Sequence, residues 1–184
     1  MREVALAERD GTLWVFDGKA GQPVGHCALG APPSQVASLD REALLCLFVG
    51  KARAIRWADG ATVWEMDLAG VSEVRLRDLD GDGALDGLLR REGGPLTAVR
   101  WRDRTTLWEV ATGVTALASV PQKGDVIVRR GEEWVGLDAA TGRPIWDVGP
   151  LPQEPHLVAD WDGDGRMEIV VAPSEGGLAC LDAE

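Results

Sequence analysis

Tyrosine and asparagine are absent from this 184-residue chain, and histidine occurs only twice, at His26 and His156. Neither histidine stands near a Ser or Cys nucleophile motif, and the G-x-S-x-G turn of many hydrolases is missing. The chain also has no G-x-G-x-x-G and no G-K-[ST] segment, so nothing in it supports nucleotide binding. We therefore expect that the chain is not an enzyme in its own right.

Cysteine is scarce, and long apolar runs are missing. The three cysteines, Cys27, Cys46 and Cys180, form no C-x-x-C pair, which predicts small buried hydrophobic residues rather than a redox site. No run reaches the roughly 18 apolar residues of a membrane-spanning helix, so we expect no membrane insertion. Residues 1–3 lead straight into an apolar strand without a signal peptide, which favours a cytoplasmic protein or a piece of an exported one.

Positive charge is also in short supply. Thirty acidic residues face 19 basic ones, giving a formal net charge of −11. A surface of this sign has little with which to neutralise phosphates, so nucleic acids and anionic membranes are poor partners.

The apolar residues that are present predict strands. Short apolar runs at 4–6, 44–49, 126–128 and 169–171 are bounded by Gly, Asp and Pro. No segment of ten or more residues has helical periodicity. The sequence therefore predicts an all-β fold.

The chain also repeats itself. A shift of 82 residues places Trp64 on Trp146 and the segment 78–86 on 160–168, and a weaker copy around Trp108 lies between them. The unit is therefore about 41 residues with four strands, which is typical of β-propeller blades. Because Trp64, Trp108 and Trp146 recur at one point of the unit, we expect them to pack between blades.

One propeller domain over 1–184 is predicted, with about four and a half to five blades. The approximate units are 3–42, 43–83, 84–124, 125–165 and a partial 166–184. Counting from the strand before each acidic loop gives three strands, three full blades and three final strands. A closed five-bladed ring, a half-propeller that pairs with a second copy and a fragment of a larger propeller all stay open. Open terminal blade edges favour a homodimer.

Two acidic loops share the spacing D-x-D-G-D-G-x-x-(D/E). Carboxylates at positions 1, 3, 5 and 9, with a backbone carbonyl at position 7, offer hard oxygen ligands that select Ca²⁺. An EF-hand is disfavoured because position 12 is Leu89 or Val171 rather than Glu. The predicted ligands of the two calcium sites are Asp78, Asp80, Asp82, Ala84 and Asp86 in one loop, and Asp160, Asp162, Asp164, Arg166 and Glu168 in the other. The corresponding segments 40–42 and 119–125 depart from this spacing and are predicted to bind no metal.

These motifs resemble two repeat families. "LDAATGRPIW" (137–146) and, more loosely, "WADGATVW" (57–64) resemble the tryptophan-docking repeat of PQQ-like propellers. "DLDGDGALD" (78–86) and "DWDGDGRME" (160–168) resemble the calcium loops of FG-GAP or VCBS repeats, as in integrin α-subunit propellers. The N-terminal copy departs from the first pattern, with Gly25 where the tryptophan would stand.

The resemblance implies a non-catalytic, calcium-binding propeller that serves as a scaffold for a protein or glycan partner. In this interpretation the ions make the loops between strands rigid. The alternative is a fragment of a PQQ-dependent quinoprotein dehydrogenase or of a larger surface or adhesion propeller. Quinoprotein dehydrogenases use a disulfide of adjacent cysteines and an Asn calcium ligand, and this chain has neither.

Overall fold

The computed structural model describes residues 3–111, 113–117, 125–151, 157–159, 168–171 and 179–182. Every regular element among them is a β-strand, so the predicted all-β class is confirmed. No helix in the part of the chain that the structure describes is long and apolar enough to cross a membrane.

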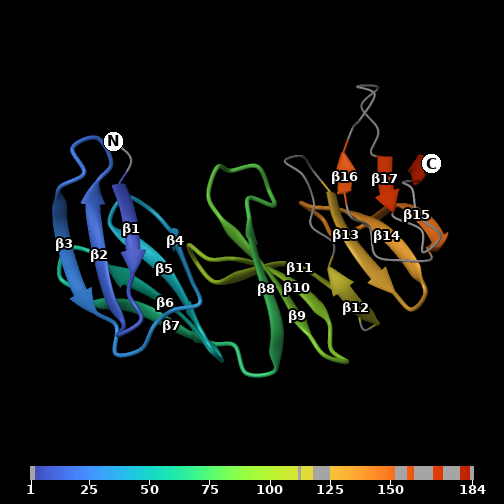
Figure 1. The fold of residues 1–184 in the computed structure, drawn as a ribbon. Coiled ribbons are helices and arrows are strands. Elements are labelled where there is room, and N and C mark those ends of the chain that lie inside the picture. Colours follow the sequence, from blue (N-terminus) through green and yellow to red (C-terminus); the bar gives the residue numbers. More distant parts are fainter. Residues whose placement is uncertain are drawn as a thin grey trace. The chain divides into compact units, whose positions relative to one another are not determined.

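The strands form antiparallel sheets, each built from strands that follow one another in sequence (Figure 1). The first and last described sheets have three strands, and the three sheets between them have four. Within the described residues the strand count from the sequence is confirmed, and the sheets resemble the blades of a partial propeller. From the second sheet onward, each sheet begins one strand earlier than the corresponding repeat unit, so unit 43–83 begins at the second strand of its sheet.

The sheets contain the following strands. The first holds β1 (Glu3–Ala7), β2 (Thr12–Asp17) and β3 (Pro23–Ala28), and the second holds β4 (Gln35–Ser38), β5 (Ala43–Phe48), β6 (Lys51–Arg56) and β7 (Thr62–Asp67). The third holds β8 (Val71–Arg77), β9 (Asp86–Arg91), β10 (Leu96–Arg100) and β11 (Thr105–Val110). The fourth holds β12 (Val114–Leu117), β13 (Asp125–Arg130), β14 (Glu133–Asp138) and β15 (Pro144–Pro150), and the last holds β16 (Leu157–Ala159), β17 (Glu168–Val171) and β18 (Ala179–Asp182).

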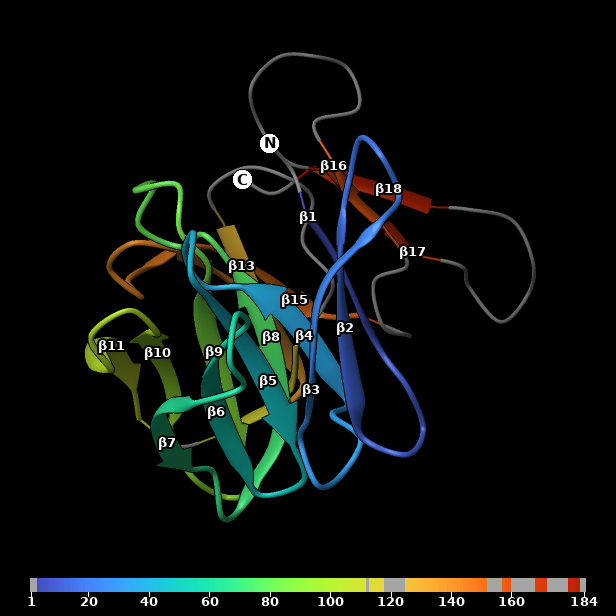
Figure 2. The same cartoon turned by 90° about the vertical axis from the view of Figure 1, so that its left-hand side faces the viewer.

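The chain divides into two compact units, Met1–Val71 and Ser72–Glu184. In the first unit, the sheets β1–β3 and β4–β7 share one core, and Figure 2 shows β4 to β7 side by side in chain order. Leu13 and Val15 of β2 pack there with Cys46 of β5 and Ile55 of β6. Every residue of β5 is buried, which explains why its sequence is an unbroken apolar run rather than an alternating one.

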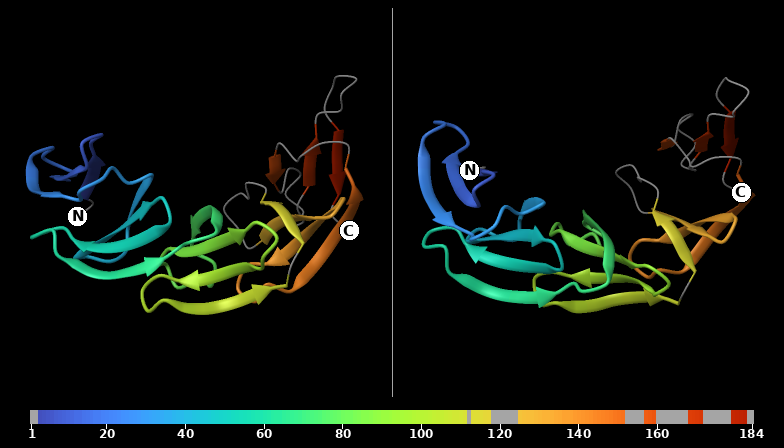
Figure 3. Two further views of the ribbon diagram at one scale, coloured as in Figure 1. Left: turned by 90° about the horizontal axis from the view of Figure 1, so that it is seen from below. Right: turned by 60° about the horizontal axis from the view of Figure 1, so that its bottom comes forward.

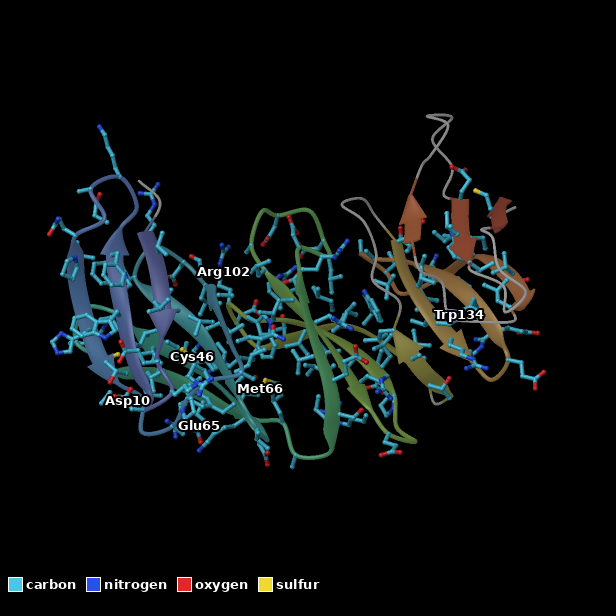
Figure 4. The ribbon with its side chains drawn as sticks, in the orientation of Figure 1. Asp10, Cys46, Glu65, Met66, Arg102 and Trp134 are labelled. Carbon is cyan, nitrogen blue, oxygen red and sulfur yellow. The ribbon has the colours of Figure 1, made fainter. Side chains whose placement is uncertain are left out.

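The cysteines only partly match their prediction. Cys27 and Cys46 are buried, and burial raises the pKa of the Cys46 thiol to about 12, as expected for an inert hydrophobic residue (Figure 4). Cys180 is exposed on β18, so the prediction was wrong for this residue.

In the second unit, β13 and β14 are neighbouring strands in the yellow-to-orange part of the ribbon (Figure 3). Their side chains belong to two cores. Val126 and Val128 pack with residues of the sheet β8–β11, whereas Ile127 packs with Trp134, Ile169 and neighbouring side chains on the opposite face. Since successive side chains of a strand point to opposite faces, a strand between two cores must be apolar at every position.

Trp108 joins two sheets of the second unit. Its indole Nε1 donates a hydrogen bond of 2.7 Å to the carbonyl of Ala139. Its ring covers Gly142, where a Cβ would lie 2.6 Å from the indole. Packing between blades is therefore confirmed for Trp108. Trp146 covers Gly136 on the adjacent strand of its own sheet, and it also packs against the core that holds Ile169 and Val171 of the last sheet.

In the first sheet, Gly25 stands at the strand position that Trp108 has in the third sheet. Gly25 pairs with Val15 across β2 and β3, as Trp108 pairs with Ala98 across β10 and β11. The ring of Trp57 lies 3.6 Å from the position of a Cβ on Gly25. A tryptophan from the second sheet thus covers the place that the missing tryptophan leaves.

We predict that Gly142→Ala is markedly more destabilising than Gly131→Ala. Both glycines have positive φ, +68° and +67°, so both variants strain the backbone by about 1–2 kcal/mol. Only Gly142 lies against Trp108, and overpacking there adds roughly 1–3 kcal/mol. Urea unfolding with unchanged m-values measures the difference, and equal losses for the two variants would contradict the docking role of Trp108.

Candidate metal centre

The first acidic loop connects β8 to β9 and is curled tightly by two glycines. Gly81 and Gly83 have φ of +79° and +83°, in the left-handed region that residues with a Cβ avoid. Because the backbone turns back on itself at these points, carboxylates at alternate positions can reach a common centre.

Backbone amides hold the loop from inside. The Asp78 carboxylate accepts hydrogen bonds from the amides of Gly81 and Gly83, at 2.8 and 2.9 Å. Asp80 accepts one from the amide of Asp82 at 3.1 Å, and Asp82 accepts one from the amide of Ala84 at 2.7 Å. Each carboxylate therefore fixes a turn of the loop, which orders the site before any ion binds.

Three of the predicted ligands converge. Asp78, Asp80 and Asp86 each place one carboxylate oxygen within 4.8 Å of the others, which is a spacing that a metal ion could bridge. Asp82 is not in this group: its carboxylate accepts a hydrogen bond from the Ala84 amide and lies 3.9 Å from the Arg102 guanidinium. The ligand roles of Asp82 and of the Ala84 carbonyl stay predictions.

Asp86 is the unusual member of the group. It is the first residue of β9 and is 0% exposed. One oxygen, Oδ2, accepts a hydrogen bond of 3.0 Å from the Leu79 amide, whereas Oδ1 is buried without a hydrogen-bond partner. Burial raises the pKa of Asp86, and the charges of Asp80 and Asp82 raise it further. A buried acceptor without a partner is costly, and a cation beside it would remove that cost.

Arg100 and Arg102 lie outside the acidic motif, and both reach this loop. Arg100, the last residue of β10, forms an ion pair with Asp80, and this hydrogen bond lowers the pKa of the Asp80 carboxyl. Arg100 is also the register partner of Asp86 across β9 and β10. The short hairpin around Gly93 and Gly94 was the signal in the sequence that could have placed it there.

The other loops lack this arrangement in the described residues, or lie outside them. Asp160, Asp162, Asp164 and Arg166 lie outside the described residues, so the second predicted site stays untested. Glu168 is buried at the first position of β17, as Asp86 is in β9.

The segments 40–42 and 119–125, which depart from the acidic spacing, each lead into a strand whose first residue differs from Asp86 in its setting. Asp125, the first residue of β13, accepts a hydrogen bond of 3.4 Å from Trp146, and burial raises its pKa. In the second sheet Ala43 begins β5, so the strand starts without a carboxylate, and Asp40 closes the turn through the Ala43 and Glu42 amides.

Comparison with known proteins establishes the fold alone. The sequence matches no protein-family model and no curated protein sequence. The structure resembles the dihydro-heme d1 dehydrogenase NirN, with a TM-score of 0.66 and 18% identity over 99% of this chain and 42% of that one. It also resembles Sqt1 from Saccharomyces cerevisiae, with a TM-score of 0.59 and 15% identity over 98% of this chain and 55% of that one.

A third similar structure is BamB from Moraxella catarrhalis, with a TM-score of 0.51 and 17% identity over 98% of this chain and 58% of that one. The chain therefore spans about half the length of the structures it resembles. Since the sequence identity is low in all three cases, the structural similarity shows the architecture and does not indicate a biochemical role.

We predict opposite effects for two neutralised carboxylates in metal-free protein at pH 7. A carboxyl whose pKa is higher in the folded than in the unfolded chain lowers stability once pH exceeds both values. Asp86→Asn removes such a charge and should leave the free energy of unfolding unchanged or higher. Asp78→Asn weakens the bonds to two loop amides and should lower it by about 1 kcal/mol or more. Urea unfolding in EDTA checks both, and an equal loss for Asp86→Asn would show that its buried charge is already compensated.

Proposed function

We propose that this chain is a non-catalytic propeller-type scaffold whose acidic loop between β8 and β9 binds Ca²⁺, and whose surface binds a protein or glycan partner. The metal assignment rests on Asp86. Its buried Oδ1 lacks a hydrogen-bond partner, and its carboxylate converges with those of Asp78 and Asp80. The donor set consists only of carboxylate oxygens, which favours a hard cation over Zn²⁺ or copper.

Calcium suits this loop better than magnesium. Ca²⁺ accepts six to eight oxygens at about 2.3–2.6 Å in irregular geometry, whereas Mg²⁺ requires a near-ideal octahedron and retains several waters. The three carboxylates come from a curled loop and the start of a strand, which is not an octahedral frame. Carbonyl oxygens and water would complete the coordination shell.

The proposed role of the ion is structural. It would give the Asp86 oxygen a partner, reduce the repulsion among neighbouring carboxylates and fix the turn between two adjacent strands of one sheet. Because the site assembles only in the folded chain, the free energy of binding would add to that of folding. The same spacing supports a second, equivalent site at 160–168.

We predict that Ca²⁺ raises the unfolding temperature. At a calcium concentration 100 times Kd, the free energy of unfolding should increase by about 2.7 kcal/mol per site. Differential scanning calorimetry in EDTA and in millimolar Ca²⁺ tests this, and calorimetric titration counts the ions. Asp80→Asn and Asp162→Asn should each remove one equivalent and leave the other. An unfolding temperature that is the same in EDTA and in Ca²⁺ would overturn the metal assignment.

An apolar face of the first sheet supports a protein partner. Val4 and Leu6 of β1 are 55% and 52% exposed, whereas the alternate residues of this sheet face the buried core. Leu6 pairs in register with Trp14, which stacks on His26 with ring centroids 4.7 Å apart. Since sheets of a propeller are normally covered on both faces, we propose that a second copy of the chain covers this one.

We predict that Leu6→Glu weakens self-association. A charge in the centre of an apolar interface is buried without a partner, so the dimer dissociation constant should rise at least tenfold. Val49→Glu is the matched control, because Val49 is 98% exposed in the turn between β5 and β6 and should tolerate a charge. Sedimentation velocity over a concentration series distinguishes the two variants. A wild-type chain that stays monomeric at all concentrations would refute the second-copy proposal.

A further inference from the structure

The acidic loop already holds a positive charge of its own. Arg100 stands directly opposite Asp86 across β9 and β10, and directly opposed residues present their side chains on the same face of a sheet. Its Nη2 forms an ion pair with Oδ2 of Asp80. A cation is therefore present beside two of the three converging carboxylates.

This internal cation fits the site incompletely. Nε of Arg100 and Oδ1 of Asp86 are both buried without hydrogen-bond partners, although the two residues face each other. The guanidinium thus forms an ion pair with Asp80 but donates no hydrogen bond to Oδ1 of Asp86. The burial of Oδ1 of Asp86 without a hydrogen-bond partner is an observation separate from the spacing of the three carboxylates, and it indicates a further ligand.

A second carboxylate is within reach of the same guanidinium. Nη1 of Arg100 lies 3.8 Å from Asp103, in the turn between β10 and β11. An arginine displaced from Asp80 could therefore remain paired with Asp103. By contrast, Arg102 lies 3.9 Å from Asp82, outside the converging group, and its side chain is 60% exposed.

We infer that Arg100 is an exchangeable counter-ion of this site, so that a divalent cation binds by displacing Arg100 from Asp80. This inference rests on the proposed calcium site and adds its regulation: affinity is set by the competition between Arg100 and the ion. The exchange links the loop at 78–86 to the turn at 101–104, because Arg100 pairs with both and would keep only its pair with Asp103 when the ion binds.

The experiment compares Arg100→Gln with Arg102→Gln, using calorimetric titration with Ca²⁺ alone. Removing the competitor should lower the calcium Kd of Arg100→Gln roughly tenfold, whereas Arg102→Gln should stay within about twofold of wild type. In EDTA, Arg100→Gln should unfold at a lower temperature than wild type, because Asp80 has lost its counter-ion and no metal ion replaces it. Arg100→Lys keeps the charge without the planar fork, so its Kd should lie between those of wild type and Arg100→Gln.

The outcomes separate this inference from the calcium proposal. Calcium binding by wild type with equal or weaker binding by Arg100→Gln would overturn the exchange and leave the calcium site standing. Calcium binding by Arg100→Gln but not by wild type would support the exchange in its strongest form. No binding to this loop by either protein would overturn both. If Arg100→Gln does not fold in EDTA, titration of Arg100→Lys distinguishes the same three outcomes.

Discussion

The buried carboxylate of Asp86 at the start of β9 is the constraint around which the acidic loop is arranged. It is removed from water at a point where only one of its oxygens finds an amide donor. A charge in that position requires positive counter-charge, because desolvation would otherwise favour the neutral acid. Arg100 supplies part of it, and the convergence of Asp78 and Asp80 creates the place where an ion would supply the rest.

Packing within the second unit explains why much of this loop is exposed while Asp86, at its end, is buried. β9 continues from Asp86 into Gly87, Leu88 and Leu89, all of them buried. Trp101 lies over Gly87, where a Cβ would approach the indole to 2.5 Å. The strand is therefore held on its own sheet by apolar contacts, and its first residue is carried into the interior with it. Asp86 is buried because its strand is buried.

Much of the fold could be predicted from the sequence because its signals are local. Apolar runs such as 126–128, bounded by turn residues, marked strands, and the 82-residue self-similarity grouped them into sheets. The convergence of Asp78, Asp80 and Asp86 also follows from local spacing, since glycines permit the curl. Arg100 was missed because it belongs to another strand, and only the register of the hairpin brings it opposite Asp86. Trp57 covers Gly25 through packing between sheets, which spacing along one repeat does not encode.

The central question is whether a divalent cation binds Oδ1 of Asp86. A crystal structure of the full chain grown with millimolar CaCl₂, with anomalous data, tests it most directly. We expect an anomalous peak about 2.3–2.6 Å from carboxylate oxygens of Asp78, Asp80 and Asp86, with Arg100 turned from Asp80 toward Asp103. Electron density with no anomalous peak at this loop, and Arg100 still paired with Asp80, would contradict cation binding by Asp86.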